Sequence, residues 1–272
     1  MPRESEPPAS LAVPGDLDAA LAGARRRLGV FGRDFHHFET VGSTNDVANR
    51  LALSGAPEGT TVVADAQTAG RGRMGRTWYS PSGAGLYVSV VLRPGPTPSP
   101  ALWTLVAGVG LAEALRRVSG LDVRIKWPND LVLGRKKICG ILAEGSASRG
   151  ATRHVVVGFG INLRPVAYPA DLSGRATSLE GELGRPVERG IVLTASLEAL
   201  ATHIEDVRNS GVGPILDRWR ALAPSSIGSQ VEWRIPGGVQ RGTTAGIDQD
   251  GALLVGTGGG IERIVAGEVR WL

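Results

Sequence analysis

The sequence is poor in cysteine and has no long apolar run. Its one cysteine, Cys139, can form no disulfide within the chain, which is typical of a protein of the reducing cytoplasm. The longest apolar stretch, Ala101 to Ala112, is too short to span a bilayer. Residues 1–8 are polar and rich in proline, unlike the apolar core of a signal peptide. These absences predict a cytoplasmic protein that is not anchored in a membrane.

The composition and the charge are those of a globular protein. Hydrophobic residues make up 42% of the 272 residues, and the mean hydropathy is +0.01. The formal net charge of +4 and the pI of about 9.7 suit an anionic substrate as well as nucleic acid. The chain is longer than one average domain but short for two large ones, and it contains no internal repeat.

The hydrophobic pattern divides the chain into three parts. Residues 1–15 are predicted to be disordered, residues 16–224 to form a domain of helices and strands, and residues 225–272 to form a small β-barrel of short strands and close turns. Asp16 is expected to cap a helix, and residues 164–189 to form a loop. Strands are predicted at 35–40, 61–65, 86–92, 123–127, 137–143, 154–158, 231–235, 240–247, 252–255 and 262–265, and further helices at 46–52, 101–118, 191–207 and 214–222.

The segment from Gly70 to Gly75, which reads Gly-Arg-Gly-Arg-Met-Gly, is the most informative part of the sequence. It satisfies the pattern G-x-G-x-x-G, but a dinucleotide-binding loop leads from a strand directly into a helix. Here the following residues, 77–83, cannot start a helix. Glycines let the backbone close over a ligand, and the guanidinium groups of Arg71 and Arg73 are suited to grip phosphate. The segment therefore predicts a flexible, cationic cover over a phosphorylated or adenylated intermediate.

Four further motifs stand out besides this loop and its lead-in, Gln67-Thr68-Ala69. They are Gly42-Ser43-Thr44-Asn45, Lys126-Trp127-Pro128-Asn129-Asp130, Lys136-Lys137-Ile138-Cys139-Gly140-Ile141-Leu142 and Gly158-Phe159-Gly160-Ile161-Asn162-Leu163. In order and spacing, the five motifs resemble those of the biotin–protein ligase family. The resemblance is strong over residues 40–165 and extends to 225–272 through the small barrel. Five ordered motifs are far more specific than any one of them.

The resemblance implies a fold and a reaction. The fold is of the α+β class, with a mixed, largely antiparallel sheet flanked by helices, as in class II synthetase-like ligases, and a C-terminal SH3-like barrel. The reaction uses ATP and Mg²⁺ to convert biotin into biotinyl-5′-AMP and pyrophosphate. Biotin then passes to a lysine of a biotin carboxyl carrier protein. Cations suit this chemistry, because a carboxylate that attacks a phosphate brings negative groups together.

The resemblance also implies a role for each motif. Lys137 takes the place of the catalytic lysine, with Arg73 and Asp130 as its catalytic partners. Lys136 is expected to point away, since side chains on a strand alternate between faces. Mg²⁺ is expected to be bound mainly through the nucleotide phosphates, with Asp130 as its one candidate ligand. The implied biotin-binding residues are Ser43, Thr44, Asn45, Gln67, Gly70, Arg71, Lys137 and Gly140, and the implied adenylate-binding residues are Arg71, Arg73, Trp78, Asn129, Asp130, Lys137 and Asn162.

Simpler interpretations compete with several of these assignments. Ser43 and Thr44 could serve only as a helix cap, and Asp130 could only shape a turn. Cys139 fits a small buried strand residue. His36 and His37 have no metal-binding partners in the sequence and receive no function.

Two other functions remain open at this point. One is a lipoate or octanoate ligase or transferase of the related fold, although the Lys-Trp-Pro-Asn-Asp motif and the Gly/Arg segment favour biotin. The other is a regulator that binds biotinyl-AMP or DNA without catalysis. Many relatives carry an N-terminal helix-turn-helix domain, but residues 1–41 offer no room for one. We therefore expect no DNA binding, while the resemblance allows a homodimer.

Overall fold

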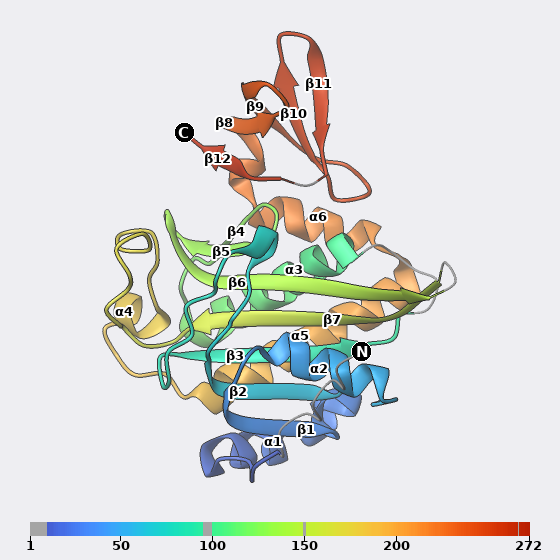
Figure 1. Cartoon of the computed structure of the whole chain (residues 1–272), viewed down its shortest axis with the longest axis vertical. Helices are drawn as coiled ribbons and strands as arrows, with labels where there is room; N and C mark the ends of the chain where they lie inside the picture. The colour runs from blue at the N-terminus through green and yellow to red at the C-terminus, as the bar shows by residue number, and fades with distance from the viewer. Residues whose placement is uncertain (1–9, 95–99, 149–150, 266) are drawn as a thin grey trace, which may run out of the picture.

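The computed structural model describes residues 10–94, 100–148, 151–265 and 267–272. They form a large sheet covered by helices and a smaller sheet at the C-terminal end (Figure 1). The large sheet has seven strands, of which only β1 and β2 pair in parallel. In spatial order they are β1 (Phe35–Val41), β2 (Thr61–Gln67), β3 (Gly85–Leu92), β7 (Ala151–Asn162), β6 (Lys136–Ser148), β5 (Asp130–Leu133) and β4 (Arg124–Lys126).

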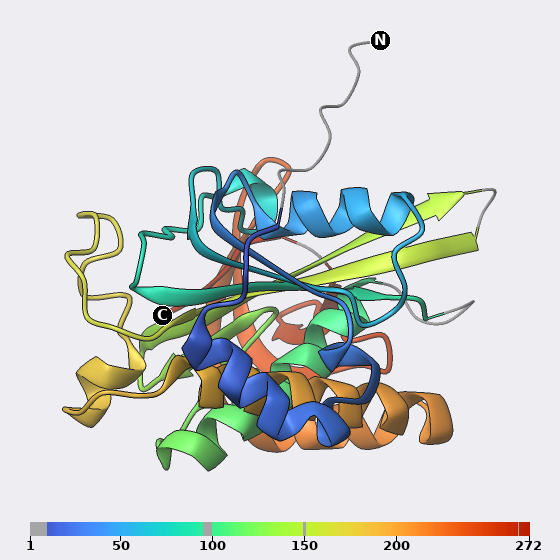
Figure 2. The same cartoon turned by 90° about the horizontal axis from the view of Figure 1, so that it is seen from below.

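Helices cover the two faces of the large sheet unequally. Figure 2 shows α1 (Gly15–Leu28), α3 (Pro100–Ser119) and α5 (Arg189–Ser210) beneath one face, while α2 (Thr44–Leu53) lies on the other. The apolar residues of α3 recur at helical spacing, and they bury Val109, Leu111 and Leu115 completely. The face below the sheet is therefore the hydrophobic core, and the face that carries α2 is only partly covered.

The smaller sheet is antiparallel and has five strands. It packs beside α6 (Gly213–Leu222), with Trp127 Nε1 donating a 3.0 Å hydrogen bond to the Gly251 carbonyl and Lys126 Nζ 4.9 Å from the centre of the Trp271 ring. A third contact is the ion pair between Arg76 and Glu268. In spatial order the strands are β11 (Gly260–Ile264), β10 (Leu253–Thr257), β9 (Gly238–Ile247), β8 (Ile227–Ile235) and β12 (Val269–Trp271).

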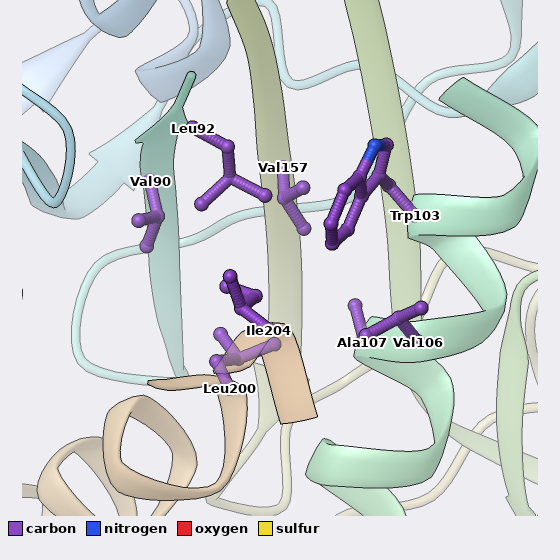
Figure 3. Close-up of a pocket in the computed structure, with 8 residues that line it drawn as sticks. All are labelled: Val90, Leu92, Trp103, Val106, Ala107, Val157, Leu200 and Ile204. Carbon is purple, nitrogen blue, oxygen red and sulfur yellow. The ribbon is translucent and has the colours of Figure 1, made fainter. Parts of the chain in front are cut away.

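A small pocket lies inside the core, between the sheet and the helices α3 and α5 (Figure 3). It encloses about 10 Å³, and only the indole of Trp103 among its eight lining side chains carries a polar atom. A site this small and apolar does not hold an ordered water. The pocket is therefore a packing defect and offers nothing to a substrate.

The fold class predicted from the sequence is confirmed. The structure differs in detail, because β5, β12 and the short helix α4 (Leu179–Leu183) were not predicted, the last of them inside the expected loop. The expected cap of the first helix is wrong: α1 begins after Pro14, and Asp16 lies within its first turn and binds Arg189. No helix in the described part of the chain is long and apolar enough to cross a membrane.

The domain boundaries of the sequence prediction stay predictions. Of the segment expected to be disordered, residues 1–9 lie outside the described residues. Further on, the Leu11 backbone N–H donates to the His37 carbonyl at 2.9 Å, so residue 11 already pairs with the edge strand β1.

The core can be tested at one buried leucine of α3. Leu111→Ala is expected to lower the free energy of unfolding by about 2–5 kcal/mol, because it removes contacts and leaves a cavity. Leu53→Ala, at a side chain that is 52% exposed, is the control and should change it by less than about 0.5 kcal/mol. Urea unfolding of both variants checks this, and equal effects would contradict the assigned core.

Candidate active site

The predicted site residues gather on the face of the large sheet that carries α2. Figure 2 shows α2 and the connection between β2 and β3 on this face. We call residues 68–84 of that connection the Gly/Arg loop. Its base is fixed to the residues before α2, since the backbone N–H groups of Thr68 and Ala69 donate to the carbonyls of Val41 and Gly42 at 2.9 and 2.8 Å.

A chain of hydrogen bonds joins the start of α2 to the end of β2. The backbone N–H and the hydroxyl of Thr44 both donate to Gln67 Oε1, at 2.9 and 3.2 Å. The Gln67 amide nitrogen donates to the Ser80 hydroxyl at 2.9 Å. The Ser89 hydroxyl lies 2.8 Å from Thr44 Oγ1 and 2.6 Å from Asn45 Oδ1. Because Thr44, Asn45 and Ser89 are buried, this network fixes the orientation of both amide side chains.

Ser43 stands apart from the network. It occupies the N-cap position of α2 and is 3% exposed, but its hydroxyl does not cap the helix. Within the described ranges, the hydroxyl has no hydrogen-bond partner from the protein. Ser43 is therefore the N-cap residue without a capping side-chain hydrogen bond, and its hydroxyl is free to bond a ligand.

Three glycines on β6 and β7 leave a strip of one sheet face without side chains. Gly140 and Gly160 are direct partners in the pairing of the two strands, and Gly158 lies two residues from Gly160 on the same side. A Cβ on Gly158 would lie 2.0 Å from Asn45 Oδ1, and one on Gly160 would lie 2.2 Å from Trp78 Nε1. The glycines thus make room for two predicted site residues.

Trp78 lies flat against this strip. A Cβ on Gly140 would approach its ring to 2.8 Å, and Lys137 Nζ is 5.1 Å from the ring centre. The indole nitrogen is buried and has no partner among the described residues. The Trp78 backbone N–H donates to the Gly70 carbonyl at 2.8 Å, which ties the tryptophan to the Gly/Arg loop. The Trp78 ring therefore forms an apolar wall, and its indole N–H is a donor without a partner in the described residues.

Lys137 faces this wall and is held by Asp130. The Lys137 ammonium lies 2.5 Å from Asp130 Oδ1, on the neighbouring strand β5. The Lys137 backbone is fixed from the other side, since its N–H donates to the Arg175 carbonyl at 2.8 Å. Lys136 instead is exposed and lies 3.8 Å from Glu182. The two neighbouring lysines therefore have different surroundings.

Two further cations lie near Asp130. The Arg73 guanidinium is 5.9 Å from the centre of the Trp127 ring, and burial lowers its pKa while Asp130 acts in the opposite direction. Burial likewise lowers the pKa of Lys126, again against the influence of Asp130. Cations that are partly buried and share one carboxylate favour an anionic ligand.

The structure gives other partners to three residues that the sequence assigned to the nucleotide or to biotin. The Asn129 amide donates to the Ile141 carbonyl at 2.8 Å, and the Asn162 amide donates to the Thr177 carbonyl at 2.9 Å. Arg71 forms ion pairs with two carboxylates, those of Asp46 and Glu144. In this structure all three side chains hold the protein together around the site.

The sequence did not indicate several residues that contact the site. Ser80 and Ser89 belong to the hydrogen-bond network, while Asp46 and Glu144 bind Arg71. Ser89 alone carried a signal, because it is the one serine within the apolar strand β3. The others lie in no recognisable motif and are brought to the site by the fold.

The described residues contain no group of three or more histidine, cysteine, aspartate or glutamate side chains that could hold a metal ion. Asp130 alone is near the cations. A divalent ion at this site would therefore depend on oxygen ligands of a bound phosphate, as is usual for Mg²⁺.

The comparisons with known proteins agree with this geometry. Residues 37–162 match the model of the biotin/lipoate A/B protein ligase family, and residues 226–270 match that of the biotin protein ligase C-terminal domain. The biotin–[acetyl-CoA-carboxylase] ligase of Paracoccus denitrificans is 37% identical over 84% of this chain and 96% of its own length. The bifunctional ligase/repressor BirA of Bacillus subtilis is 36% identical over 94% of this chain and 80% of its own length.

The fold is also shared with a solved structure. Biotin protein ligase from Aquifex aeolicus, in complex with biotin and ATP, matches with a TM-score of 0.76 at 30% identity, over 88% of this chain and 99% of that one. The fold and the site define a ligase of the biotin and lipoate class. Within this class, the chain belongs to the biotin protein ligase family.

The close packing at the glycine strip can be tested through the free energy of unfolding of a glycine variant. Gly158→Ala should lower the free energy of unfolding by about 1–3 kcal/mol, because the new Cβ overlaps the buried Asn45 amide. Gly23→Ala, on the exposed side of α1 with no atom within 4 Å of the new Cβ, is the control and should leave it unchanged or raise it. A Gly158→Ala protein as stable as the wild type would contradict the described packing.

Proposed function

We propose that the chain is a biotin–protein ligase. It activates biotin with ATP to biotinyl-5′-AMP and transfers biotin to a lysine of a biotin carboxyl carrier domain. The observation that carries this proposal is the position of Lys137, which lies between the apolar wall of Trp78 and the carboxylate of Asp130. The relatives that carry the name of this activity support it over most of the chain.

In the first step, a carboxylate oxygen of biotin attacks the α-phosphorus of ATP. A phosphorus–oxygen bond forms. The bond between the α-phosphorus and the oxygen that bridges to the β-phosphate breaks, and pyrophosphate leaves with its electrons. Negative charge increases on the phosphate oxygens, and the Lys137 ammonium and the Arg73 guanidinium are the groups that offset it. Mg²⁺, bound through the phosphates and Asp130, would supply a further positive charge to the leaving group.

In the second step, the neutral amine of the acceptor lysine attacks the carbonyl carbon of the mixed anhydride. The amide bond forms, AMP leaves with the electrons of the broken carbon–oxygen bond, and the proton of the amine passes to the departing phosphate or to water. Asp130 is the carboxylate next to Lys137 and is proposed to orient the entering lysine. The Gly/Arg loop would exclude water, because the anhydride is easily hydrolysed.

The biotin head is proposed to bind beside the buried network of α2 and β2. A ureido group carries two N–H donors and one carbonyl acceptor, so a matching set of fixed polar groups is needed. The free hydroxyl of Ser43 and the fixed groups of Thr44, Asn45 and Gln67 supply it. Gly70, Arg71 and Gly140 would border the pocket, and the two glycines would permit close approach of the backbone to the ligand.

The adenylate is proposed to lie against Trp78 and the motifs on either side of Lys137. The ring of Trp78 would supply an apolar surface for the adenine, while its indole nitrogen stays buried against Gly160. Asn129 and Asn162 donate their amide N–H groups to backbone carbonyls, so their carbonyl oxygens remain for the nucleotide. Both side chains also steady the strands that carry Asp130 and Lys137.

A lipoate or octanoate ligase is the competing function, because the family model of residues 37–162 includes both classes. The match of residues 226–270 to the biotin protein ligase C-terminal domain favours biotin. The acceptor is proposed to belong to a biotin-dependent carboxylase, as in the name of the Paracoccus relative. Repressor activity is not part of the proposal, and neither is a contact with DNA or with a membrane.

The deciding experiment is ATP–pyrophosphate exchange by the purified protein, with biotin, lipoate and octanoate as parallel substrates. Exchange that depends on biotin alone is expected. Exchange with lipoate or octanoate in its place would establish the competing function, and no exchange with any of the acids would refute a carboxylate-activating ligase.

The role of Lys137 can be separated from a general loss of charge. Lys137→Ala should slow single-turnover formation of biotinyl-AMP by about 10² to 10³-fold, as for the loss of one transition-state donor, without unfolding the protein. Lys136→Ala removes the same charge one residue away, at an exposed position, and is the control. Lys137→Ala with a near-normal rate, or an equally slow Lys136→Ala, would refute the assignment.

The role of Arg73 can be tested through the lifetime of the intermediate. Arg73→Gly should release biotinyl-AMP faster and label lysines of unrelated proteins, because a cation near the phosphate is lost. Met74→Gly adds the same flexibility to the loop without removing a charge, at a side chain that is 69% exposed, and should retain the intermediate. The measurement is the rate at which labelled biotinyl-AMP passes a size filter, and equal rates for Arg73→Gly and wild type would argue against this role.

A further inference from the structure

The Gly/Arg loop is fastened to two other elements through one guanidinium group. Arg71 Nη2 lies 2.7 Å from Asp46 Oδ1 on α2 and 2.8 Å from Glu144 Oε2 on β6. Asp46 and Glu144 are far apart in the sequence, and both bind this arginine. The loop is thereby held across the space between α2 and the sheet.

We propose that Asp46 and Glu144 are positioning residues that keep the Gly/Arg loop closed over the acyl-adenylate, and that the Arg71 side chain is the latch that they bind. This inference rests on the proposed function. It assigns to the Arg71 side chain a partner within the protein in place of a phosphate, and it gives Asp46 and Glu144 a function in the reaction.

The charges around Arg71 differ from those around Arg73. Arg71 and its two carboxylates carry a formal charge of −1 together, which repels a polyphosphate. Arg73 forms no ion pair within the described ranges, is partly buried and stacks on Trp127. Arg73 is therefore the arginine that is free to bind phosphate, while Arg71 is neutralised by the protein.

The latch is connected to the pocket proposed for biotin. Glu144 Oε2 accepts a hydrogen bond from Arg71 and also one from Asn45 Nδ2, at 2.7 Å. Asn45 is 4% exposed and is bonded on its other side to Ser89. A ligand bound at Asn45 would further stabilise this hydrogen bond to Glu144, so occupation of the pocket is expected to favour the closed loop.

The loop has the features of a cover that swings on a fixed base. The backbone at Thr68 and Ala69 is bonded to the segment before α2, and beyond it the Gly72 N–H donates to the Arg76 carbonyl at 2.6 Å, which closes the loop on itself. The side chains of the latch are each between 41% and 44% exposed. Ion pairs with this exposure are weak and sensitive to salt, which suits a cover that must open in every reaction cycle.

The test uses Asp46→Asn, which keeps the shape of the side chain but removes its charge. We expect release of biotinyl-AMP, measured by filtration after a single turnover, to become about three-fold to five-fold faster, as for the loss of one exposed ion pair. Formation of biotinyl-AMP should change less than the release rate, and 0.5 M salt should narrow the difference between variant and wild type. Asp217→Asn, which breaks an exposed ion pair on α6, is the matched control and should release at the wild-type rate.

Arg71→Met distinguishes the latch from a phosphate ligand. If Arg71 is the latch, this variant copies the faster release of Asp46→Asn and leaves the KM for ATP unchanged. A raised KM for ATP with unchanged release would overturn the proposal, as would wild-type release by Asp46→Asn and Glu144→Gln alike.

A second readout does not depend on the activity. Trypsin cleaves after Arg73 and Arg76, and cleavage of the loop should be faster in Asp46→Asn and Glu144→Gln than in the wild type and Asp217→Asn. Equal cleavage would overturn the latch. If the wild type made no biotinyl-AMP but the two variants were still cleaved faster, the proposed function would fail and the closed loop would stand.

Discussion

The rest of the site depends on one constraint, which is the absence of side chains at three neighbouring positions on one face of β6 and β7. Gly140, Gly158 and Gly160 leave a smooth strip there, and the Trp78 indole and the Asn45 amide occupy the space that Cβ atoms would take. Trp78 in turn lies beside Lys137 and is bonded to Gly70. The position of the Gly/Arg loop, the lysine and the polar network all follow from how closely these groups approach the sheet.

The charged groups of the site are divided between two tasks. Around Asp130, the cations Lys137, Lys126 and Arg73 outnumber their carboxylate, and burial lowers the pKa of the last two. Around Arg71, the carboxylates outnumber the cation. One end of the loop region thus attracts phosphate, while the other end is held by the protein. This division would allow the same loop to contact a nucleotide while it stays fixed to the scaffold.

Local patterns in the sequence were sufficient for much of the fold. The helical spacing of Leu102, Leu105, Val109 and Leu115 predicted α3, and the five motifs predicted the family. Contacts between distant segments were not predictable. The partners of Arg71, the buried position of Ser89 and the surroundings of Trp78 each depend on elements that meet only in the folded chain, and short-range periodicity contains no information on them.

The contact of the C-terminal sheet with Trp127 has a consequence for hybrid ligases. Gly251 accepts the Trp127 hydrogen bond in a backbone conformation with φ of 81°, and a Cβ there would lie 2.5 Å from Leu105 of α3. The turn between β9 and β10 therefore favours glycine at this point, since any other residue would adopt a strained backbone conformation and displace the Leu105 side chain. A C-terminal domain borrowed from another ligase would therefore fit this catalytic domain best if it brought a glycine to the same place. The two parts of the chain are thus not independent of each other in sequence at this junction.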